Sequence, residues 1–309
     1  MQALEIYRQA GNRLGEANAL TNLARLQHLT GTYPEAGAAI MQAVEIFRQA
    51  GNRLGEANAL NDLGRVRYLT SDYPGAADAH ARALEISRQI GHRHGEANAL
   101  THLGRLRQKT GDFSAAEDVL AQALEIFRQI GNRLGEANAL TYLGRVRHAT
   151  GDLLRAAAVL AQALEISRQI GHCHCGIGAL HGLGRVRYLT GDFRGAADAQ
   201  AQMLEICHRL GDRFHEAWAL NHYAATIAAT GDRHRALALY QQSLAITREV
   251  NMPAEEAFAL EGIADHHLAT GNPAQGAAHL RQALQIYQRL GLRPDTERVT
   301  ARLAGLAPQ

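Results

Sequence analysis

Asparagine and arginine recur in this chain at a fixed interval of 40 residues, in positions that together suit peptide binding. The asparagines are Asn18, Asn58, Asn98 and Asn138, and the arginines are Arg25, Arg65, Arg105, Arg145 and Arg185. An Asn side chain both donates and accepts hydrogen bonds, so a row of them can pair with a peptide backbone without reading its sequence. A parallel row of guanidinium groups favours carboxylates. The two rows predict a site for an extended acidic segment.

Two further polar columns share the same face of the repeated segment, because positions three or four residues apart lie on one side of a helix. One column contributes Thr101 and Thr141, and the other contributes Tyr68 and Tyr188. All four are candidates for the same binding surface. A second interpretation stays open: recent duplication would copy these residues with everything else, and the near-identical blocks that begin at residues 11, 51 and 131 favour it.

The elements that carry these columns are marked by glycines, which also recur every 40 residues in two interleaved series. Between them lie two apolar patterns of helical period, represented by Ala17, Leu20 and Ala24 and then by Ile40 and Val44. Each repeat is therefore predicted to be a hairpin of two helices. We call them helix A, which carries the polar columns, and helix B.

The turns between the helices contain residues that favour the end of one helix and the start of the next. In Gly111-Asp112 the glycine can adopt the left-handed conformation that ends a helix, and the aspartate can cap the next one. Ser71 and Asn251 replace glycine in two turns, and both are small polar residues that can still end a helix.

The uninterrupted register predicts an all-α fold, an α-solenoid wound as a right-handed superhelix, with residues 1–309 forming a single domain. Seven complete hairpins are expected at 13–50, 53–90, 93–130, 133–170, 173–210, 213–250 and 253–290, with a partial helix at 1–10 and a terminal helix at 294–306. Stacked hairpins bury a continuous strip, so the length does not require separate domains. The half hairpin at the start leaves an apolar face unpaired, which predicts either end-to-end self-association or fraying of residues 1–10.

Solution scattering can test the superhelix. A compact globule of 309 residues would have a radius of gyration of about 19 Å by the usual size scaling. An elongated solenoid must give a clearly larger value. A measured radius close to that of the globule would contradict the predicted shape.

Composition narrows the function further. The formal net charge is only +2, whereas a dedicated nucleic-acid binder carries a strongly basic face. No apolar run approaches the roughly 20 residues needed to cross a bilayer, and no leader precedes the first expected helix. Three cysteines are too few for a disulfide framework in a chain of this length. We expect a cytoplasmic protein without a cofactor, a membrane partner or a nucleic-acid partner.

The repeat resembles the tetratricopeptide repeat over essentially the whole chain. The residues that match its signature are Leu23, Ala24, Gly31, Ala36, Ala43 and Val44. With its 40-residue unit, the chain is similar to the spindle-orientation adaptors whose repeats carry Leu-Gly-Asn, and to the C-terminal arrays of actinobacterial signalling ATPases and antibiotic-regulatory transcription factors. The resemblance implies that helices A form an inner wall that holds extended peptide segments.

The polar rows stop in the sixth and seventh hairpins. Trp218 and Phe258 replace Asn there, and Ala225 and Asp265 replace Arg. One interpretation is an apolar anchor pocket for a ligand residue, because buried aromatic residues often dominate binding energy. The other is that these are looser capping repeats that pack the terminal helix.

The fifth hairpin departs from its sister repeats in a loop whose residues could bind a metal. Its loop carries Cys173, His174 and Cys175, and Cys207 lies at the end of the partner helix. Thiol and imidazole groups suit zinc or copper, but the spacing matches no standard zinc motif. Sequence drift in one repeat is the competing explanation, and we expect no metal.

No catalytic residue is predicted. The chain has no phosphate-binding loop and no nucleophile elbow, and His215-Glu216 lacks the second histidine of a zinc protease helix. The expected function is a non-enzymatic protein-interaction scaffold that holds an extended acidic segment of a protein or peptide in a concave groove. The alternative is a sensor or autoregulatory module of a larger signalling ATPase or transcription regulator, which the start inside a helix favours.

Overall fold

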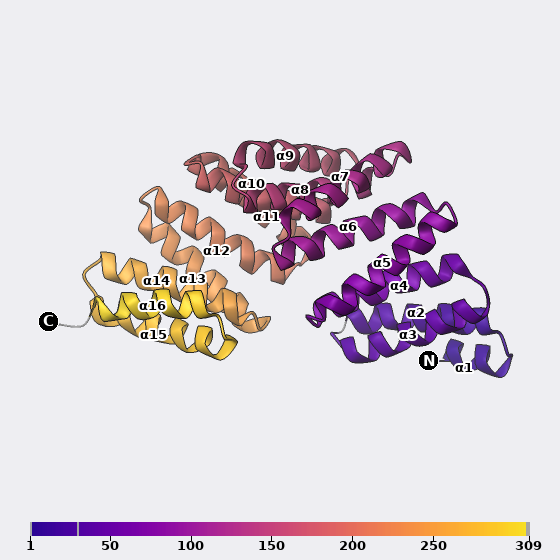
Figure 1. Ribbon diagram of the computed structural model, residues 1–309. Coiled ribbons are helices and arrows are strands. Elements are labelled where there is room, and N and C mark those ends of the chain that lie inside the picture. The colour runs from indigo at the N-terminus through magenta and orange to yellow at the C-terminus, as the bar shows by residue number, and fades with distance from the viewer. Residues whose placement is uncertain (1, 30, 307–309) are drawn as a thin grey trace. The chain divides into compact units, whose positions relative to one another are not determined.

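The computed structural model describes residues 2–29 and 31–306, and the side chains of His28 and Leu29 lie outside what it describes. This part of the chain is all-α, as expected (Figure 1). The helices are α1 Gln2–Gln9, α2 Arg13–Leu29, α3 Tyr33–Gln49, α4 Arg53–Leu69, α5 Tyr73–Gln89, α6 Arg93–Thr110, α7 Phe113–Gln129, α8 Arg133–Ala149, α9 Leu153–Gln169, α10 Cys173–Leu189, α11 Phe193–Leu210, α12 Arg213–Ala229, α13 Arg233–Glu249, α14 Pro253–Ala269, α15 Pro273–Leu290 and α16 Arg293–Ala304. None of them is both long and apolar enough to cross a membrane.

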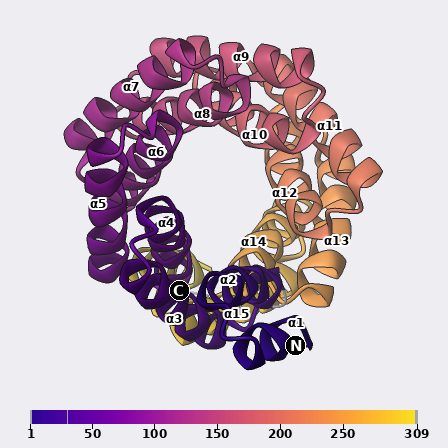
Figure 2. The same cartoon turned by 90° about the vertical axis from the view of Figure 1, so that its right-hand side faces the viewer.

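The helices gather into two compact units, Met1–Asp152 with α1 to α8 and Leu153–Gln309 with α9 to α16. Within each unit, consecutive helices pack against one another, and contacts between successive A helices join α4 to α6, α6 to α8, α10 to α12 and α12 to α14. Figure 2 shows the result for the first unit, where α4, α6 and α8 form the inner layer and α5 and α7 the outer layer. In the second unit α10, α12 and α14 form the inner layer. The predicted hairpins are therefore confirmed, while the single domain and the right-handed superhelix stay predictions.

The turns have the backbone conformation that their sequence requires. The glycines that end the helices have positive φ, for example 67° at Gly51. The two substitutes adopt the same conformation, with φ of 63° at Ser71 and 55° at Asn251. Asp72 then caps α5 by accepting the backbone N–H of Gly75. A small polar residue thus replaces glycine at a modest conformational cost and keeps the register.

Each hairpin buries the apolar stripes that the sequence displays. Ala17, Leu20 and Ala24 of α2 are buried against Ile40 and other residues of α3. Small residues on helix A let helix B approach closely, because a methyl group on Gly104 would collide with the side chain of Leu120. The core of each hairpin is therefore specified by pairs of large and small residues on the two helices.

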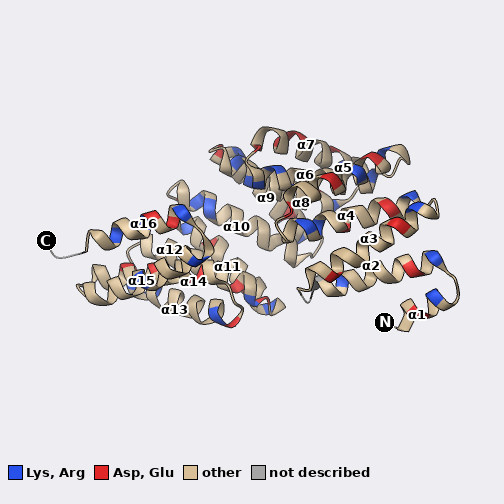
Figure 3. Ribbon diagram, turned by 60° about the horizontal axis from the view of Figure 1, so that its bottom comes forward, with Lys and Arg blue, Asp and Glu red and all other residues tan. Residues whose placement is uncertain are grey.

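A buried glutamate joins the start of most A helices to the helix before it. Glu56 is 2% exposed and accepts from Arg48 Nε at 3.1 Å and from Arg53 Nη1 at 2.7 Å. The same bridge recurs at Glu16, Glu96 and Glu136 with two arginines each, at Glu216 with His208 and Arg213, and at Glu256 with Arg248. Figure 3 shows the acidic and basic segments side by side where α3 meets α4. These bridges account for the glutamate of the repeated block.

Candidate functional site

The predicted asparagine row lies on the A helices of the first unit. Asn18, Asn58 and Asn138 are exposed, and Asn98 is partly exposed. Within the described part of the chain, Asn18 and Asn58 make no hydrogen bond through their side chains, whereas Asn98 contacts His94 Nε2 at 3.0 Å. These amides are accessible to a ligand, as a peptide-binding role requires.

The threonines do not share that surface. Thr101 and Thr141 are buried, at 6% and 7% exposure, and each donates its hydroxyl to a carbonyl one turn earlier in its own helix. This placement corrects the expectation that they line an open groove. Both threonines therefore lie at the buried edge of the polar face. Their recurrence is explained by packing and not by ligand contact.

The residue one position later does belong to the polar face, and the sequence reasoning missed it. This column contains Asn22, Asp62, His102, Tyr142, Gly182 and His222. Its spacing of four from the asparagines and three from the arginines is the signal that places it there. Asp62 changes the charge of the face, because its carboxylate contacts both Arg25 and Arg65 at 3.4 Å.

The next two arginines of the first unit rest on aromatic rings. The guanidinium of Arg105 lies 4.1 Å from the ring centroid of Tyr68, and that of Arg145 lies 5.6 Å from the ring centroid of Tyr142. Contacts of this kind contribute about 0.5–1 kcal/mol at exposed sites and orient the planar group. The predicted Arg row is therefore not uniform, since its members have acidic partners at one end and aromatic supports at the other.

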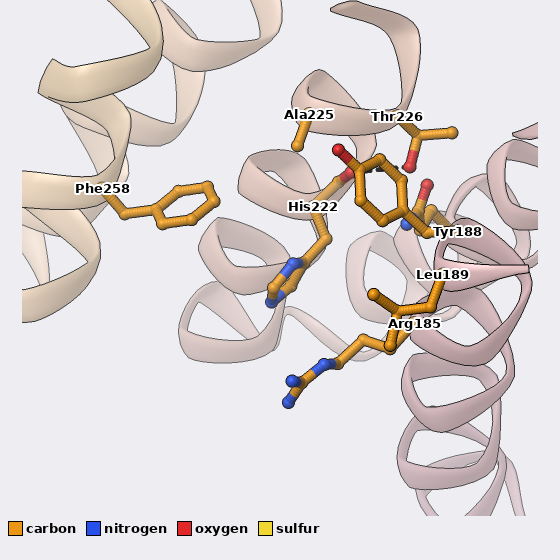
Figure 4. A pocket seen from close by; sticks show the side chains of 8 residues that line it. Arg185, Tyr188, Leu189, His222, Ala225, Thr226 and Phe258 are labelled. Atoms are coloured by element: carbon orange, nitrogen blue, oxygen red, sulfur yellow. Dashed lines mark hydrogen bonds between the residues drawn. The ribbon is translucent and has the colours of Figure 1, made fainter. Parts of the chain in front are cut away.

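The second unit holds a pocket of about 290 Å³ on the same face of its A helices (Figure 4). It is lined by Arg185, Tyr188 and Leu189 of α10, Gln200 of α11, His222, Ala225 and Thr226 of α12, and Phe258 of α14. The alanine stands where the earlier repeats have arginine, and its short side chain leaves the space open. Arg185, Tyr188 and Phe258, all predicted from the sequence, are thus brought together at one pocket.

Two polar side chains of this pocket, Arg185 and Gln200, lack an ion-pair or hydrogen-bond partner among the described residues. No carboxylate in the described residues pairs with Arg185, and loss of hydration along its length lowers its pKa although the residue as a whole is exposed. Gln200 is 3% exposed, and its buried Oε1 has no hydrogen-bond donor among the described residues. An unpaired cation and an unpaired acceptor in the lining of one pocket suit a ligand that carries both a carboxylate and an N–H group.

His222 forms part of the apolar wall. Burial, and then the nearby Arg185 charge, lower its pKa to about 4, so the imidazole is neutral at pH 7. Its ring lies 5.8 Å from that of Phe258. The pocket therefore presents a single formal charge at neutral pH, that of Arg185.

The two predicted anchor residues, Trp218 and Phe258, have different surroundings in the structure. Phe258 lines the pocket, whereas Trp218 stacks on His181 with ring centroids 3.9 Å apart. Its ring also lies 6.1 Å from that of His222. Trp218 is thus held by neighbours of its own chain, and Phe258 is the aromatic residue open to a ligand.

The cysteine loop lacks the geometry of a metal site. Among the described residues, no three His, Cys, Asp or Glu side chains come close enough to hold an ion. Cys173 Sγ instead accepts from Arg209 Nη2 at 3.0 Å. Burial raises the pKa of Cys175, and burial with nearby carboxylates raises that of Cys207 to about 12, which disfavours the thiolates that metals need. In the described part of the chain, His174 makes a ring contact with His215 and approaches Asp212 at 4.0 Å.

Comparisons with known proteins agree with this architecture. No curated protein matches the sequence. Among solved structures, the apo form of RapI is 14% identical with a TM-score of 0.70, over 89% of this chain and 99% of that one. A Rap protein complexed with competence and sporulation factor is 14% identical with a TM-score of 0.68, over 95% and 86%. The likeness at these identities shows the fold.

A third similar structure is a signal transduction ATPase with numerous domains and a tetratricopeptide-repeat sensor, from Pyrococcus horikoshii. It is 14% identical with a TM-score of 0.66, over 86% of this chain and 42% of that one. Two family models, both described as tetratricopeptide repeat, match residues 28–89, 56–129 and 95–169 and residues 217–251. Together they span more than half of the sequence, and the helical hairpins agree with them. The chain belongs to the tetratricopeptide-repeat proteins.

Proposed function

We propose that this protein is a non-enzymatic interaction scaffold that binds an extended acidic segment of a partner along its A helices. In this proposal the pocket of the second unit receives one acidic residue of that segment. The carboxylate pairs with Arg185, a backbone N–H donates to Gln200 Oε1, and the rest of the residue packs against Phe258. The accessible asparagines of the first unit bind backbone groups without sequence preference.

The observation that carries the proposal is the state of Arg185. The cation lines a pocket and has no acidic partner within the described chain, while Arg25 and Arg65 share Asp62. Partial loss of hydration lowers the pKa of Arg185 and so disfavours its charge, which an incoming carboxylate would stabilise. Structural similarity adds support, since the Rap protein named above forms a complex with competence and sporulation factor on the same fold.

A peptide comparison tests the proposal. Two fluorescent peptides of equal length are compared, one with Glu at about every third position, the spacing expected from the rise of an extended chain along stacked helices, and one with Gln there. We expect the acidic peptide to bind at least about tenfold more tightly at low salt, and this advantage to shrink as salt screens the charges. Equal affinities for the two peptides would contradict the proposal.

The second candidate is a sensor or autoregulatory module, favoured by the likeness to the repeat sensor of the signal transduction ATPase. In that case the occupant of the groove is a segment of the same protein or its complex. Coding sequence for a nucleotide-binding or DNA-binding domain next to this one would support the sensor.

A further inference from the structure

The fifth hairpin lacks the buried glutamate that joins most A helices to the preceding helix. The position that holds Glu56, Glu96 and Glu136 in earlier repeats is occupied by Gly176. A cavity of about 310 Å³ lies there, between α9, α10 and α11 of the second unit. The cavity is separate from the pocket at Arg185, since the two share no lining residue.

The arginine that would bind this glutamate is still present. Arg168 corresponds to Arg48 and Arg128, each of which donates its Nε to the glutamate of the next helix. Within the described residues Arg168 has no carboxylate partner and donates instead to Gln202 Oε1 at 2.7 Å. The fifth hairpin thus keeps the arginine of the bridge but lacks the glutamate carboxylate that this arginine binds in the sister repeats.

A second arginine, which the sister repeats lack at this position, lines the same cavity. Arg209 stands where the sister repeats have glutamine, and Cys173 stands where they have arginine. Arg209 lines the cavity and donates to Cys173 Sγ, a weak acceptor that leaves most of its hydrogen-bonding capacity unused. The one acidic lining residue, Glu205, is exposed and makes no ion pair within the described chain.

The rest of the cavity lining is largely apolar, which suits a ligand with an apolar body. Leu164, Leu180 and Ile206 line the cavity with apolar surface. A methyl group on Gly176 would be at ordinary contact distance from its neighbours, the nearest at 3.8 Å, so an alanine fits there without a collision. His172 accepts the Cys175 N–H through Nδ1, which leaves Nε2 as a further donor.

We propose that this cavity binds a small carboxylic acid with an apolar body, whose carboxylate takes the place of the missing glutamate beside Arg168 and Arg209. The geometry of the sister repeats supplies the template, because their glutamates receive two donors at 2.5 to 3.1 Å. Filling the cavity would join α9 to α10 as the other bridges join their helices. The proposal is independent of peptide binding on the A-helix face.

Calorimetric titration of the full chain with hexanoate tests this, with hexanol and inorganic phosphate as control ligands. We expect saturable binding of hexanoate with a dissociation constant of about 1 mM or lower, and much weaker binding of hexanol. Gly176→Glu supplies the carboxylate within the chain and should lower hexanoate affinity at least about tenfold. Gly176→Ala should retain binding, since it adds a methyl group without a charge.

Three further variants test the role of charge. Arg168→Gln removes the charge and keeps a polar side chain, and it should also weaken hexanoate at least about tenfold, whereas Arg194→Gln removes an exposed charge elsewhere on α11 and should change nothing. Glu136→Gly opens the corresponding position of the fourth repeat and should create a second hexanoate site. Absence of saturable binding, equal binding of hexanol, preferential binding of phosphate, or full binding by Gly176→Glu would each overturn the proposal.

Discussion

Replacing Arg185 with Ala should weaken an acidic peptide by about ten- to hundredfold in dissociation constant. Hydrogen bonds to charged groups contribute roughly 1.5–3 kcal/mol, and this guanidinium has no competing carboxylate in the described chain. The same change at Arg65 should have a smaller effect, because Asp62 already satisfies that cation in part. Fluorescence anisotropy with the Glu-containing peptide measures both variants.

Arg194→Ala is the matched control, since it removes the same charge from an exposed position of α11, outside the pocket. If Arg185→Ala and this control lose the same affinity, net charge and not the pocket determines binding. If Arg185→Ala stays folded and binds as the unaltered chain does, the site is wrongly assigned and the arginine row is a product of duplication.

The hairpins could be predicted from the sequence because their signals are local. The register of glycines and apolar residues placed the ends of the hairpins within a residue or two of those observed, as for 13–50, where α2 begins at Arg13 and α3 ends at Gln49. The substitutes Ser71 and Asn251 were recognised for the same reason, since only the chemistry of the turn had to be known.

The composition of the site was harder to predict because it depends on contacts between repeats. Thr101 was assigned to the groove from its spacing, but a one-residue error rotates a helical position by about 100°. The same error hid Asp62, which lies in the neighbouring repeat from Arg25 and neutralises part of the arginine row. Gln200 carries a signal that went unused: it is a polar residue in a column where sister repeats have Leu120 and Leu160.

Repetition also gives information that a single domain lacks. Each helix junction can be compared with several copies of itself in one chain. The glycine at position 176 can therefore be recognised as the loss of a bridging glutamate. Duplication alone accounts for what the copies share. It does not account for an arginine that remains while its buried partner is lost, which is why the fifth hairpin deserves a functional test.

Lowering the pH should destabilise the first unit, where burial lowers the pKa of both His80 and His102. His80 is 2% exposed and its Nδ1 lies 3.1 Å from Asn61 Oδ1, while its ring stacks on His102. Burial, and then the charges of Arg65 and Arg105, lower the pKa of His80 to about 4. In the unfolded chain the pKa is near 6.5, so between these values only the unfolded state binds the proton. The free energy of unfolding should therefore fall as pH drops from about 6.5 to 4, by about 3 kcal/mol for this group.

The sister hairpins provide the control for this prediction. They have Thr101 with Leu120 where the second hairpin has Asn61 with His80, so the double variant Asn61→Thr/His80→Leu reproduces a pairing that the chain already packs. Urea unfolding followed by circular dichroism at pH 7.5 and 5 should show a smaller loss of stability for the variant than for the unaltered chain. The fluorescence of Trp218 reports the second unit separately, where His222 has its own pKa of about 4 and should keep its acid sensitivity. If both proteins lose the same stability in the circular dichroism measurement, His80 is not the group that makes the first unit sensitive to acid.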